Sequence, residues 1–240
     1  MLSATLVALD AVGVAAFSES EQNMTNDKTE ELEARAAAFL LMSSILRKMP
    51  EHEWVNVLAK AEVFREIPFA QGNAFVRKGS EMLCSWADGY TEAEVDGIYS
   101  DCMHLLIGPG KPAAPPWESV YSEDSQGLIF QQETLDVRRA YSRFGLQIDQ
   151  LHHEPDDHLA YEMEFVSRLC ARAAELLDSG RESEAVEVES ATISFLRDHL
   201  LNWGYQWCDL VDEHASTDFY RGLSLLIRGF LQESEALCAL

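Results

Sequence analysis

The sequence predicts an all-α fold, in which a single domain of about eight to ten helices is interrupted by one long loop rich in proline and glycine. Apolar residues recur at spacings of three and four along most of the chain, which is the period of amphipathic helices. Alternating apolar and polar runs, which are typical of strands, are almost absent. The 240 residues are enough to bury a sizeable core.

The N-terminal segment, residues 1–27, is predicted to be a disordered extension, and the helical domain is predicted to span residues 28–240. Residues 1–17 are apolar, but they contain Asp10 and lack the basic region of a signal peptide, and the run is short for a membrane helix. Polar residues follow as far as Met24, which directly precedes a strong helical pattern. We therefore expect Met24 to be the initiator, and a native N-terminus at the first residue would contradict this.

The expected helices follow the apolar pattern. The first runs from Glu30 to Met49 and is ended by Pro50, and the longest later stripe begins near Pro155 and lasts about five turns. Gly145 is placed to cap the preceding helix, and Pro155 to occupy a first turn, where its missing N–H has no cost. The remaining helices are predicted at residues 52–65, 71–86, 91–107, 126–144, 182–202 and 216–236.

The long loop is predicted at residues 108–116, where prolines remove backbone donors and restrict the residues before them. Gly110 and Lys111 lie in this loop, but Pro112 follows where a phosphate-binding loop needs Ser or Thr at the start of a helix. The Gly-x-Ser-x-Gly and Gly-x-Gly-x-x-Gly motifs are also absent from the sequence. Ordinary hydrolase and nucleotide-loop chemistry is therefore disfavoured.

The chain is strongly acidic, with 41 Asp and Glu against 18 Lys and Arg and a net charge of −23. Nucleic acids and anionic membranes carry the same sign, so neither is an expected partner, and no stable membrane insertion is predicted. The charge favours a cationic partner. A surface that only confers solubility, or one that suits a salt-rich setting, accounts for it equally well.

Five cysteines are widely spaced and never form a Cys-x-x-Cys pair: Cys84, Cys102, Cys170, Cys208 and Cys238. This pattern encodes neither a zinc knuckle nor a disulfide framework, and it fits a reducing cytosol. Cys170 falls on the apolar stripe of a predicted helix, where a buried thiol behaves as a small hydrophobe.

Residues 152–162 contain the one group of side chains with metal-ligating chemistry, namely His152, His153, Glu154, Asp157, His158 and Glu162. Imidazoles and carboxylates suit zinc or iron. However, the segment contains no His-Glu-x-x-His pair, and no second helix repeats its pattern as bundle metal sites do. No metal or other cofactor is predicted, and a metal-dependent enzyme that uses His152, His153, Asp157 and His158 is an alternative.

A simpler interpretation of Glu154, Asp156 and Asp157 is electrostatic capping of the helix that they precede. Carboxylates at a helix start accept bonds from free amides and oppose the positive end of the dipole, for about 0.3–1 kcal/mol each. His158 would then be a helix-start histidine bonded to a neighbouring carboxylate.

Three short motifs occur in a fixed order: Pro115-Pro116-Trp117-Glu118-Ser119-Val120-Tyr121, then Leu135-Asp136-Val137-Arg138 with Tyr141 and Gly145-Leu146, then Glu154-Pro155-Asp156-Asp157-His158-Leu159. Together they resemble the TorD/DmsD/NarJ family of cytoplasmic chaperones, which mature molybdoenzymes and hold their twin-arginine signal peptides until cofactor loading is complete. The helical pattern extends the resemblance over residues 28–235.

The resemblance implies a signal-peptide site that includes Asp157 and His158, which match the Asp-His pair of the family's third motif. It also assigns Pro116 and Trp117 of the first motif, and Leu105 ahead of the loop, to this site. Some members have a second tryptophan where Gly110 stands here, so part of the hydrophobic contact surface differs.

The chemistry of a twin-arginine peptide fits these positions, because two guanidinium groups followed by an apolar stretch require carboxylates beside an apolar surface. Glu118, Glu154, Asp156 and Asp157 are the expected carboxylate acceptors. Aromatic faces are expected from Trp117 and Tyr121, although Trp117 also fits a core anchor for the loop. The double substitution Asp157→Ala and His158→Ala is expected to weaken peptide binding while circular dichroism and melting stay near wild type.

Other matching residues are interpreted as structural. Arg138 is expected to pair with a carboxylate of the next helix, and Tyr141 to pack in the core. Trp203 and Trp207, one helical turn apart, are likewise interpreted as packing residues.

The sequence therefore predicts a non-catalytic, cytoplasmic chaperone for a molybdopterin oxidoreductase. Its predicted partners are the twin-arginine signal peptide and the apo catalytic subunit, which it holds until cofactor insertion and export. An acidic helical adaptor without a signal-peptide role is a second alternative. Nothing in the residues selects the client, and both a monomer and a domain-swapped dimer are compatible with the sequence.

Overall fold

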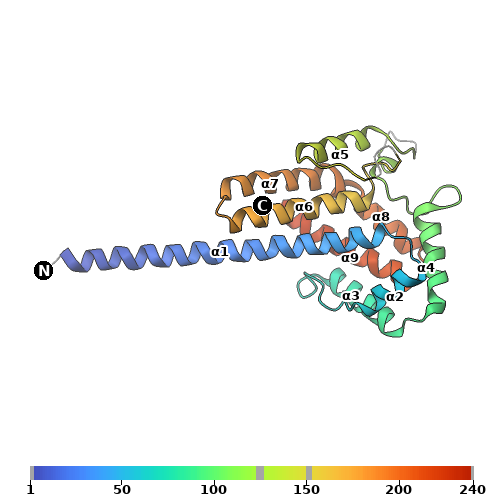
Figure 1. Cartoon of the computed structure of the whole chain (residues 1–240), viewed down its shortest axis with the longest axis horizontal. Helices are drawn as coiled ribbons and strands as arrows, with labels where there is room; N and C mark the ends of the chain where they lie inside the picture. Colours follow the sequence, from blue (N-terminus) through green and yellow to red (C-terminus); the bar gives the residue numbers. More distant parts are fainter. Residues whose placement is uncertain (1–2, 123–126, 150–152, 239–240) are drawn as a thin grey trace.

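The computed structural model describes residues 3–122, 127–149 and 153–238, with side chains from Thr25 onward (Figure 1). The helices are α1 (Ser3–Leu46), α2 (His52–Lys60), α3 (Ala74–Gly89), α4 (Val95–Cys102), α5 (Gln132–Arg143), α6 (Leu159–Asp178), α7 (Glu182–Phe195), α8 (Leu201–His214) and α9 (Asp218–Cys238). Short 3₁₀ segments, η1 (Glu92–Glu94) and η3 (Glu118–Val120), and π segments, η2 (Met103–Ile107) and η4 (Leu196–Leu200), connect them. The described residues contain no strand, which confirms the all-α prediction.

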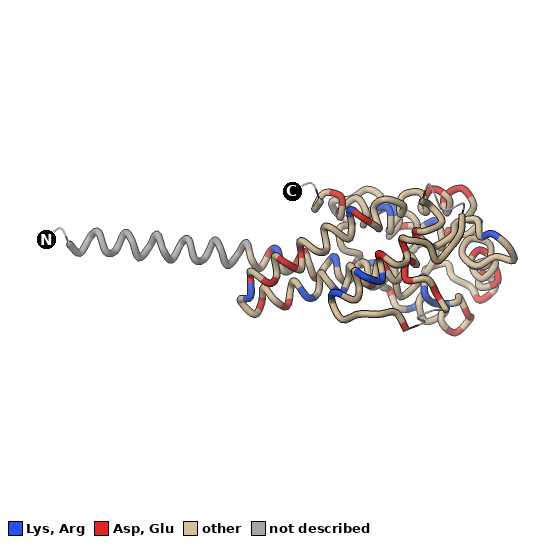
Figure 2. The backbone as a smooth tube through the Cα atoms, turned by 90° about the horizontal axis from the view of Figure 1, so that it is seen from above, with Lys and Arg blue, Asp and Glu red and all other residues tan. Residues whose placement is uncertain are grey.

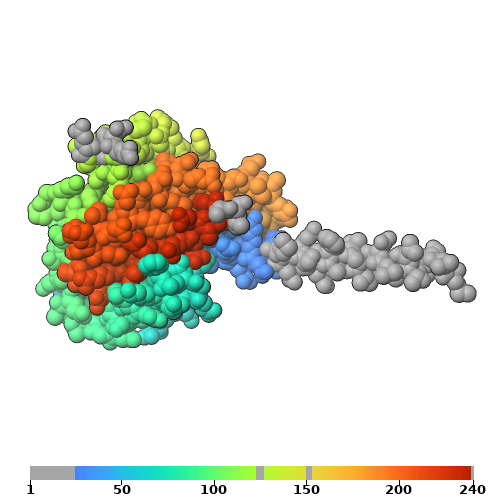
Figure 3. Space-filling view, turned by 180° about the vertical axis from the view of Figure 1, so that it is seen from behind, coloured from blue at the N-terminus to red at the C-terminus, as the bar shows by residue number. Residues whose placement is uncertain are grey.

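The core is built on two groups of three helices. Figure 1 shows α1 alongside α6, with α7 packed on the other side of α6. In the opposite half, α9 lies between α3 and α8 (Figure 3). The predicted stripe of α6 is buried throughout, from Leu159 to Leu177 and including Cys170. Each large apolar side chain buried in this way contributes about 1.5–3 kcal/mol before entropy is subtracted.

Glycine sets the closest approach in the core, between α3 and α9. A Cβ atom on Gly222 of α9 would lie 2.6 Å from Cγ of Leu83, and one on Gly79 of α3 would lie 2.9 Å from the backbone oxygen of Gly222. Since neither position has room for a methyl group, the two helix backbones pack in direct contact. Trp203 and Trp207 of α8 are buried, as the sequence predicts.

Several predicted boundaries differ from the structure. The expected helix at 126–144 begins only at Gln132, and Pro155 lies outside any helix because α6 begins at Leu159. The helix expected at 182–202 instead passes through η4 into α8, which ends at His214. A π segment changes the face that a helix turns to the core, so one apolar stripe does not continue through it.

Other expectations are met. Residues 108–116 are not helical, and Gly145 caps α5 with φ of 69°. Its N–H donates to the oxygen of Ser142, and the N–H of Leu146 donates to Tyr141. Most of the predicted disordered extension, residues 1–27, lies outside the residues whose side chains are described, so it stays a prediction.

Acidic residues occur along most of the described chain, and basic residues are scattered among them (Figure 2). Within the described ranges, no helix is both long enough and apolar enough to cross a membrane.

Candidate peptide-binding site

The first and third sequence motifs lie side by side in the structure. Trp117 and His158 form an isolated antiparallel bridge. On either side of it, the N–H of Glu118 donates to the oxygen of Asp157 at 3.0 Å, and that of Leu159 donates to Pro116 at 2.8 Å. Backbone pairing therefore fixes the Pro-Pro-Trp loop against the start of α6.

Asp157 is a buried structural anchor in this conformation. Its Oδ2 accepts a hydrogen bond from the N–H of Ser119 at 2.8 Å, and its Oδ1 accepts one from the hydroxyl of Thr134 at 2.6 Å. The side chain joins the loop, α5 and the third motif. Hydrogen bonds to a charged carboxylate are among the stronger ones in proteins, at about 1.5–3 kcal/mol.

Asp156 is also fully buried, and it faces Arg138 of α5. Its Oδ2 accepts from Nε of Arg138 at 3.1 Å and from Nη2 at 2.6 Å, and its backbone oxygen accepts from the hydroxyl of Tyr141 at 3.0 Å. The hydrogen bond to Asp156 raises the pKa of Arg138. Arg138 was expected to pair with a carboxylate of the next helix. It pairs with a carboxylate just before that helix, since α6 begins at Leu159.

The helix start corrects the capping interpretation. The carboxylates of Glu154, Asp156 and Asp157 bond to other parts of the fold instead of the first turn of α6. His158 is the N-cap, and its Nδ1 accepts from the N–H of Ala160 at 3.1 Å, not from a carboxylate. Burial lowers the pKa of His158 to about 4, with a smaller effect from the nearby cation Arg47. The imidazole is therefore neutral at pH 7.

Glu118 points inward and is not available to a ligand in this conformation. Its Oε2 lies 2.9 Å from Nδ1 of His199 in η4, and both side chains are largely buried. Burial raises the pKa of Glu118, while the contact with His199 opposes that shift. Glu162 is buried nearby and accepts from the indole N–H of Trp203 at 3.2 Å, and burial followed by Glu118 raises its pKa well above the usual value.

Trp117 and Glu154 reach the surface together. The indole N–H of Trp117 donates to Oε1 of Glu154 at 2.8 Å, and both side chains are half-buried. The Trp117 ring meets the His158 ring edge to face at 6.0 Å. Burial raises the pKa of Glu154, and the indole hydrogen bond opposes that change. Trp117 therefore both anchors the loop and presents part of its ring.

Two further predicted residues pack against the core, one of them fully buried and the other partly exposed. Leu105 is fully buried in η2. Tyr121 stacks on Trp203 with ring centres 5.2 Å apart, and its hydroxyl donates to the oxygen of Pro115 at 2.8 Å. Burial raises the pKa of Tyr121. These side chains support the loop from below.

A groove of about 450 Å³ is lined by four of the predicted residues: Pro116, Trp117, Glu154 and His158. Pro116 is buried, and the other three are partly exposed. The rest of its lining comes from the end of α1, from α4 with η2, and from α6: Leu46, Arg47, Lys48, Met49, Cys102, Leu106, Ile107 and Tyr161. Sequence reasoning missed the α1 and η2 walls. Two apolar residues near helix ends, Met49 and Ile107, could have indicated these walls, because both are exposed.

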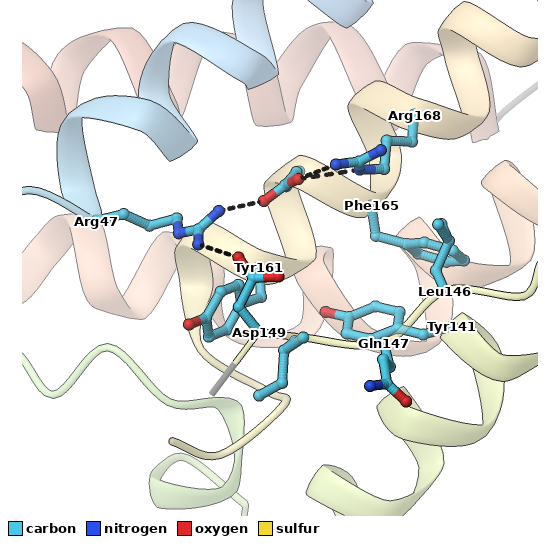
Figure 4. A pocket seen from close by; sticks show the side chains of 10 residues that line it. Arg47, Tyr141, Leu146, Gln147, Asp149, Tyr161, Phe165 and Arg168 are labelled. Atoms are coloured by element: carbon cyan, nitrogen blue, oxygen red, sulfur yellow. Dashed lines mark hydrogen bonds and ion pairs between the residues drawn. The ribbon is translucent and has the colours of Figure 1, made fainter. Parts of the chain in front are cut away.

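A smaller pocket of about 120 Å³ adjoins the groove and shares Arg47 and Tyr161 with it (Figure 4). Arg47 crosses from α1 and donates to Glu164 at 2.6 Å and to Asp149 at 3.2 Å. Its guanidinium lies 4.9 Å from the ring centre of Tyr161, and Arg168 holds the other oxygen of Glu164 at 2.6 Å. These ion pairs fix the wall between the two cavities.

The alternative metal site lacks a suitable geometry in the described part of the chain. No group of three or more His, Cys, Asp or Glu side chains there is arranged to hold a metal ion. His152 lies outside the described residues. Asp157 and His158 are already engaged by Ser119, Thr134 and Ala160.

A sequence profile described as nitrate reductase delta subunit matches residues 74–209, which is more than half of the chain and includes all three motifs. The chain belongs to this family. Membership confirms the resemblance to the TorD/DmsD/NarJ chaperones.

Similar proteins in this family are named as chaperones. The chain is 31% identical over 134 residues to the Tat proofreading chaperone DmsD of Salmonella paratyphi A, with 56% of this chain and 58% of that protein covered. It is 28% identical over 136 residues to the probable Tat proofreading chaperone DmsD of Haemophilus influenzae, with coverage of 57% and 59%. It is 26% identical over 138 residues to the chaperone protein TorD of Vibrio cholerae, with coverage of 58% and 60%. The matches thus span about three-fifths of these relatives.

Proposed function

We propose that this protein is a cytoplasmic, non-catalytic maturation chaperone that binds the twin-arginine signal peptide and the apo catalytic subunit of a molybdopterin oxidoreductase. The observation that carries the proposal is the groove where the first and third motifs meet, since Trp117, Glu154 and His158 line it together. The names of the family relatives support the same class of function.

The lining of the groove suits the apolar stretch of such a peptide. Ile107 and Met49 expose apolar surface at its rim, and the ring of Trp117 is partly open. Micromolar affinity corresponds to about −8 kcal/mol. A charge-assisted hydrogen bond contributes about 1.5–3 kcal/mol, so burial of several apolar side chains at about 1.5–3 kcal/mol each supplies the larger part.

Charge guides the cationic end of the peptide. Glu154 is the acidic side chain among the lining residues of the groove, and the neutral His158 adds no repulsion. Two cations, Arg47 and Lys48, also line it, and Arg47 is paired with Glu164 and Asp149. The net charge of −23 attracts a peptide that carries two guanidinium groups, which increases the rate of encounter.

Calorimetric titration with a twin-arginine signal peptide, and with a control peptide in which both arginines are alanine, tests the proposal. We expect the wild-type protein to bind the first peptide more tightly. Equal binding of the two would favour an adaptor that ignores the arginines, and binding of neither would contradict the proposal.

A matched pair of variants locates the site. Ile107→Asp places a charge in the groove, and Val57→Asp places one on an apolar residue of α2 that is also exposed and does not line the groove. We expect only Ile107→Asp to weaken peptide binding, by about tenfold or more, because it adds an unpaired charge to an apolar contact. Equal effects of the two variants would place the peptide elsewhere.

A further inference from the structure

The ion pair between Arg138 and Asp156 leaves part of a buried carboxylate unused. Both hydrogen bonds from Arg138 reach Oδ2, at 3.1 Å and 2.6 Å. Oδ1 is buried and has no hydrogen-bond partner among the residues that the structure describes. An ionised carboxylate accepts several hydrogen bonds, and a guanidinium normally spans both oxygens. The site therefore has unused capacity for donors.

Arg138 is the more exposed partner in this ion pair. The Asp156 side chain is fully buried, whereas the Arg138 side chain is 28% exposed. Arg138 belongs to α5, which lies at the outer edge of the body (Figure 1) and buries only Thr134, Val137 and Tyr141. Arg138 is thus the partly exposed member of the pair, and it lies outside the apolar core.

A cavity of about 330 Å³ lies directly beside Arg138. Phe130 and Leu135 line it and are 45% and 44% exposed. The neighbouring Leu128 and Ile129 are exposed as well. Phe130 has φ of 59°, a conformation that costs energy for a residue with a side chain, and it holds this apolar segment at the surface. Apolar surface is thus placed next to Arg138, the partner of the buried Asp156.

We infer that the Asp156 carboxylate and this cavity form a guanidinium subsite, which Arg138 fills in the free protein and which an arginine of the client peptide takes on binding. The inference rests on the proposed function and assigns one arginine of the peptide to a second contact outside the Trp117 groove. The apolar residues after that arginine then pack against Phe130 and Leu135. An arginine is required because its planar fork matches both carboxylate oxygens, whereas a lysine ammonium does not.

A small cation tests the subsite without any peptide. In Arg138→Ala the position of the guanidinium is vacated, and we expect ethylguanidinium to raise the melting temperature of this variant more than that of the wild type. Ethylammonium should have no such selective effect. Arg139→Ala is the matched control, since Arg139 lies on the same helix and pairs with its own neighbour Asp136. Equal responses of both variants would overturn the inference.

Peptide titration tests the competition. Arg138→Ala is expected to bind the twin-arginine peptide about five- to tenfold more tightly than the wild type, because an internal competitor for the subsite is gone. Binding of the alanine control peptide should not change, and adding Asp156→Asn should abolish the gain. Unchanged or weaker binding of the arginine peptide by folded Arg138→Ala would overturn the inference.

Failure of the guanidinium subsite can be distinguished from misfolding and from failure of the proposed function. If Arg138→Ala does not fold, Arg138→Lys keeps a cation but loses the fork, and it should show a smaller gain of the same sign. If no form of the protein binds the peptide, the proposed function fails, and the response to ethylguanidinium still decides whether the guanidinium subsite exists.

Discussion

The indole N–H of Trp117 donates to the carboxylate of Glu154 at 2.8 Å and joins two motifs that are 37 residues apart. The bond fixes the ring on the wall of the groove while part of its face stays open. Trp117 is therefore an anchor for the loop and a contact surface at the same time, and the two roles can be separated by substitution.

Trp117→Phe keeps an aromatic face and removes the N–H donor. We expect it to weaken binding of the twin-arginine peptide by about two- to tenfold, because Glu154 loses a hydrogen bond of about 0.5–1.5 kcal/mol and the ring loses its orientation. Trp117→Ala should have a larger effect, since the apolar contact is lost too. Calorimetry measures both, and an unchanged affinity in Trp117→Ala would exclude this ring from the site.

Asp157 and His158 should differ in their effects on stability. Asp157→Ala leaves the N–H of Ser119 and the hydroxyl of Thr134 without their partner, which we expect to cost about 2–4 kcal/mol. His158→Ala removes an N-cap, at about 0.5–2 kcal/mol. Urea denaturation measures the two, and equal losses would contradict the structural role of Asp157. The sequence alone suggested that the double variant would melt near the wild type. The structure instead predicts that it melts at a lower temperature, because both contacts are lost.

The apolar period predicts much of the fold, because it reports directly on which face of a helix is buried. It gives the full stripe of α6 and the core part of α1. It does not give α8 as a separate helix, since the π segment η4 rotates the buried face between Phe195 and Trp203. Periodicity assumes one uniform rotation per residue, and such a segment breaks that assumption.

The sequence predicts the site only in part, because the type of a residue does not reveal which way its side chain points. Trp117 and His158, which the motifs assign to one site, lie beside each other, but the carboxylates of Asp156 and Asp157 turn inward to Arg138 and Thr134. Partners on α5 determine that choice, and no local spacing encodes them. The η2 wall of the groove, including Ile107, carries no polar motif at all.

His158 gives the protein a dependence on pH in the acidic range. Its pKa is lowered to about 4 in the fold and is near 6.5 in an unfolded chain. Between these values the unfolded state binds more protons, so this residue makes the protein less stable as the pH falls from about 6.5 towards 4. His158→Asn keeps a good N-cap and does not titrate. We expect the variant to melt at a progressively higher temperature relative to the wild type as the pH falls from 7 to 5. A constant difference would contradict this prediction.

Glu162 should make the protein less stable as the pH rises, which is the opposite of the effect of His158. Burial, and then the nearby Glu118, raises its pKa well above the usual value, so the folded state retains a proton that the unfolded state releases. The contribution of this group to stability is therefore lost as the pH rises through the raised pKa. Glu162→Gln mimics the protonated form and can still accept from the indole of Trp203. We expect it to stabilise the protein at pH 8 and to have little effect at pH 5, as measured by thermal melting.

The matched control for this last change is Glu175→Gln, on the exposed face of the same helix, where the carboxylate pairs only loosely with Arg172 at 3.5 Å. An exposed pair of this kind contributes about 0–1 kcal/mol. Its effect on melting should therefore be small at both pH values. If Glu162→Gln destabilises the protein at pH 8 more than this control does, Glu162 is ionised in the fold, and the hydrogen bond from Trp203 outweighs the effects of burial and Glu118.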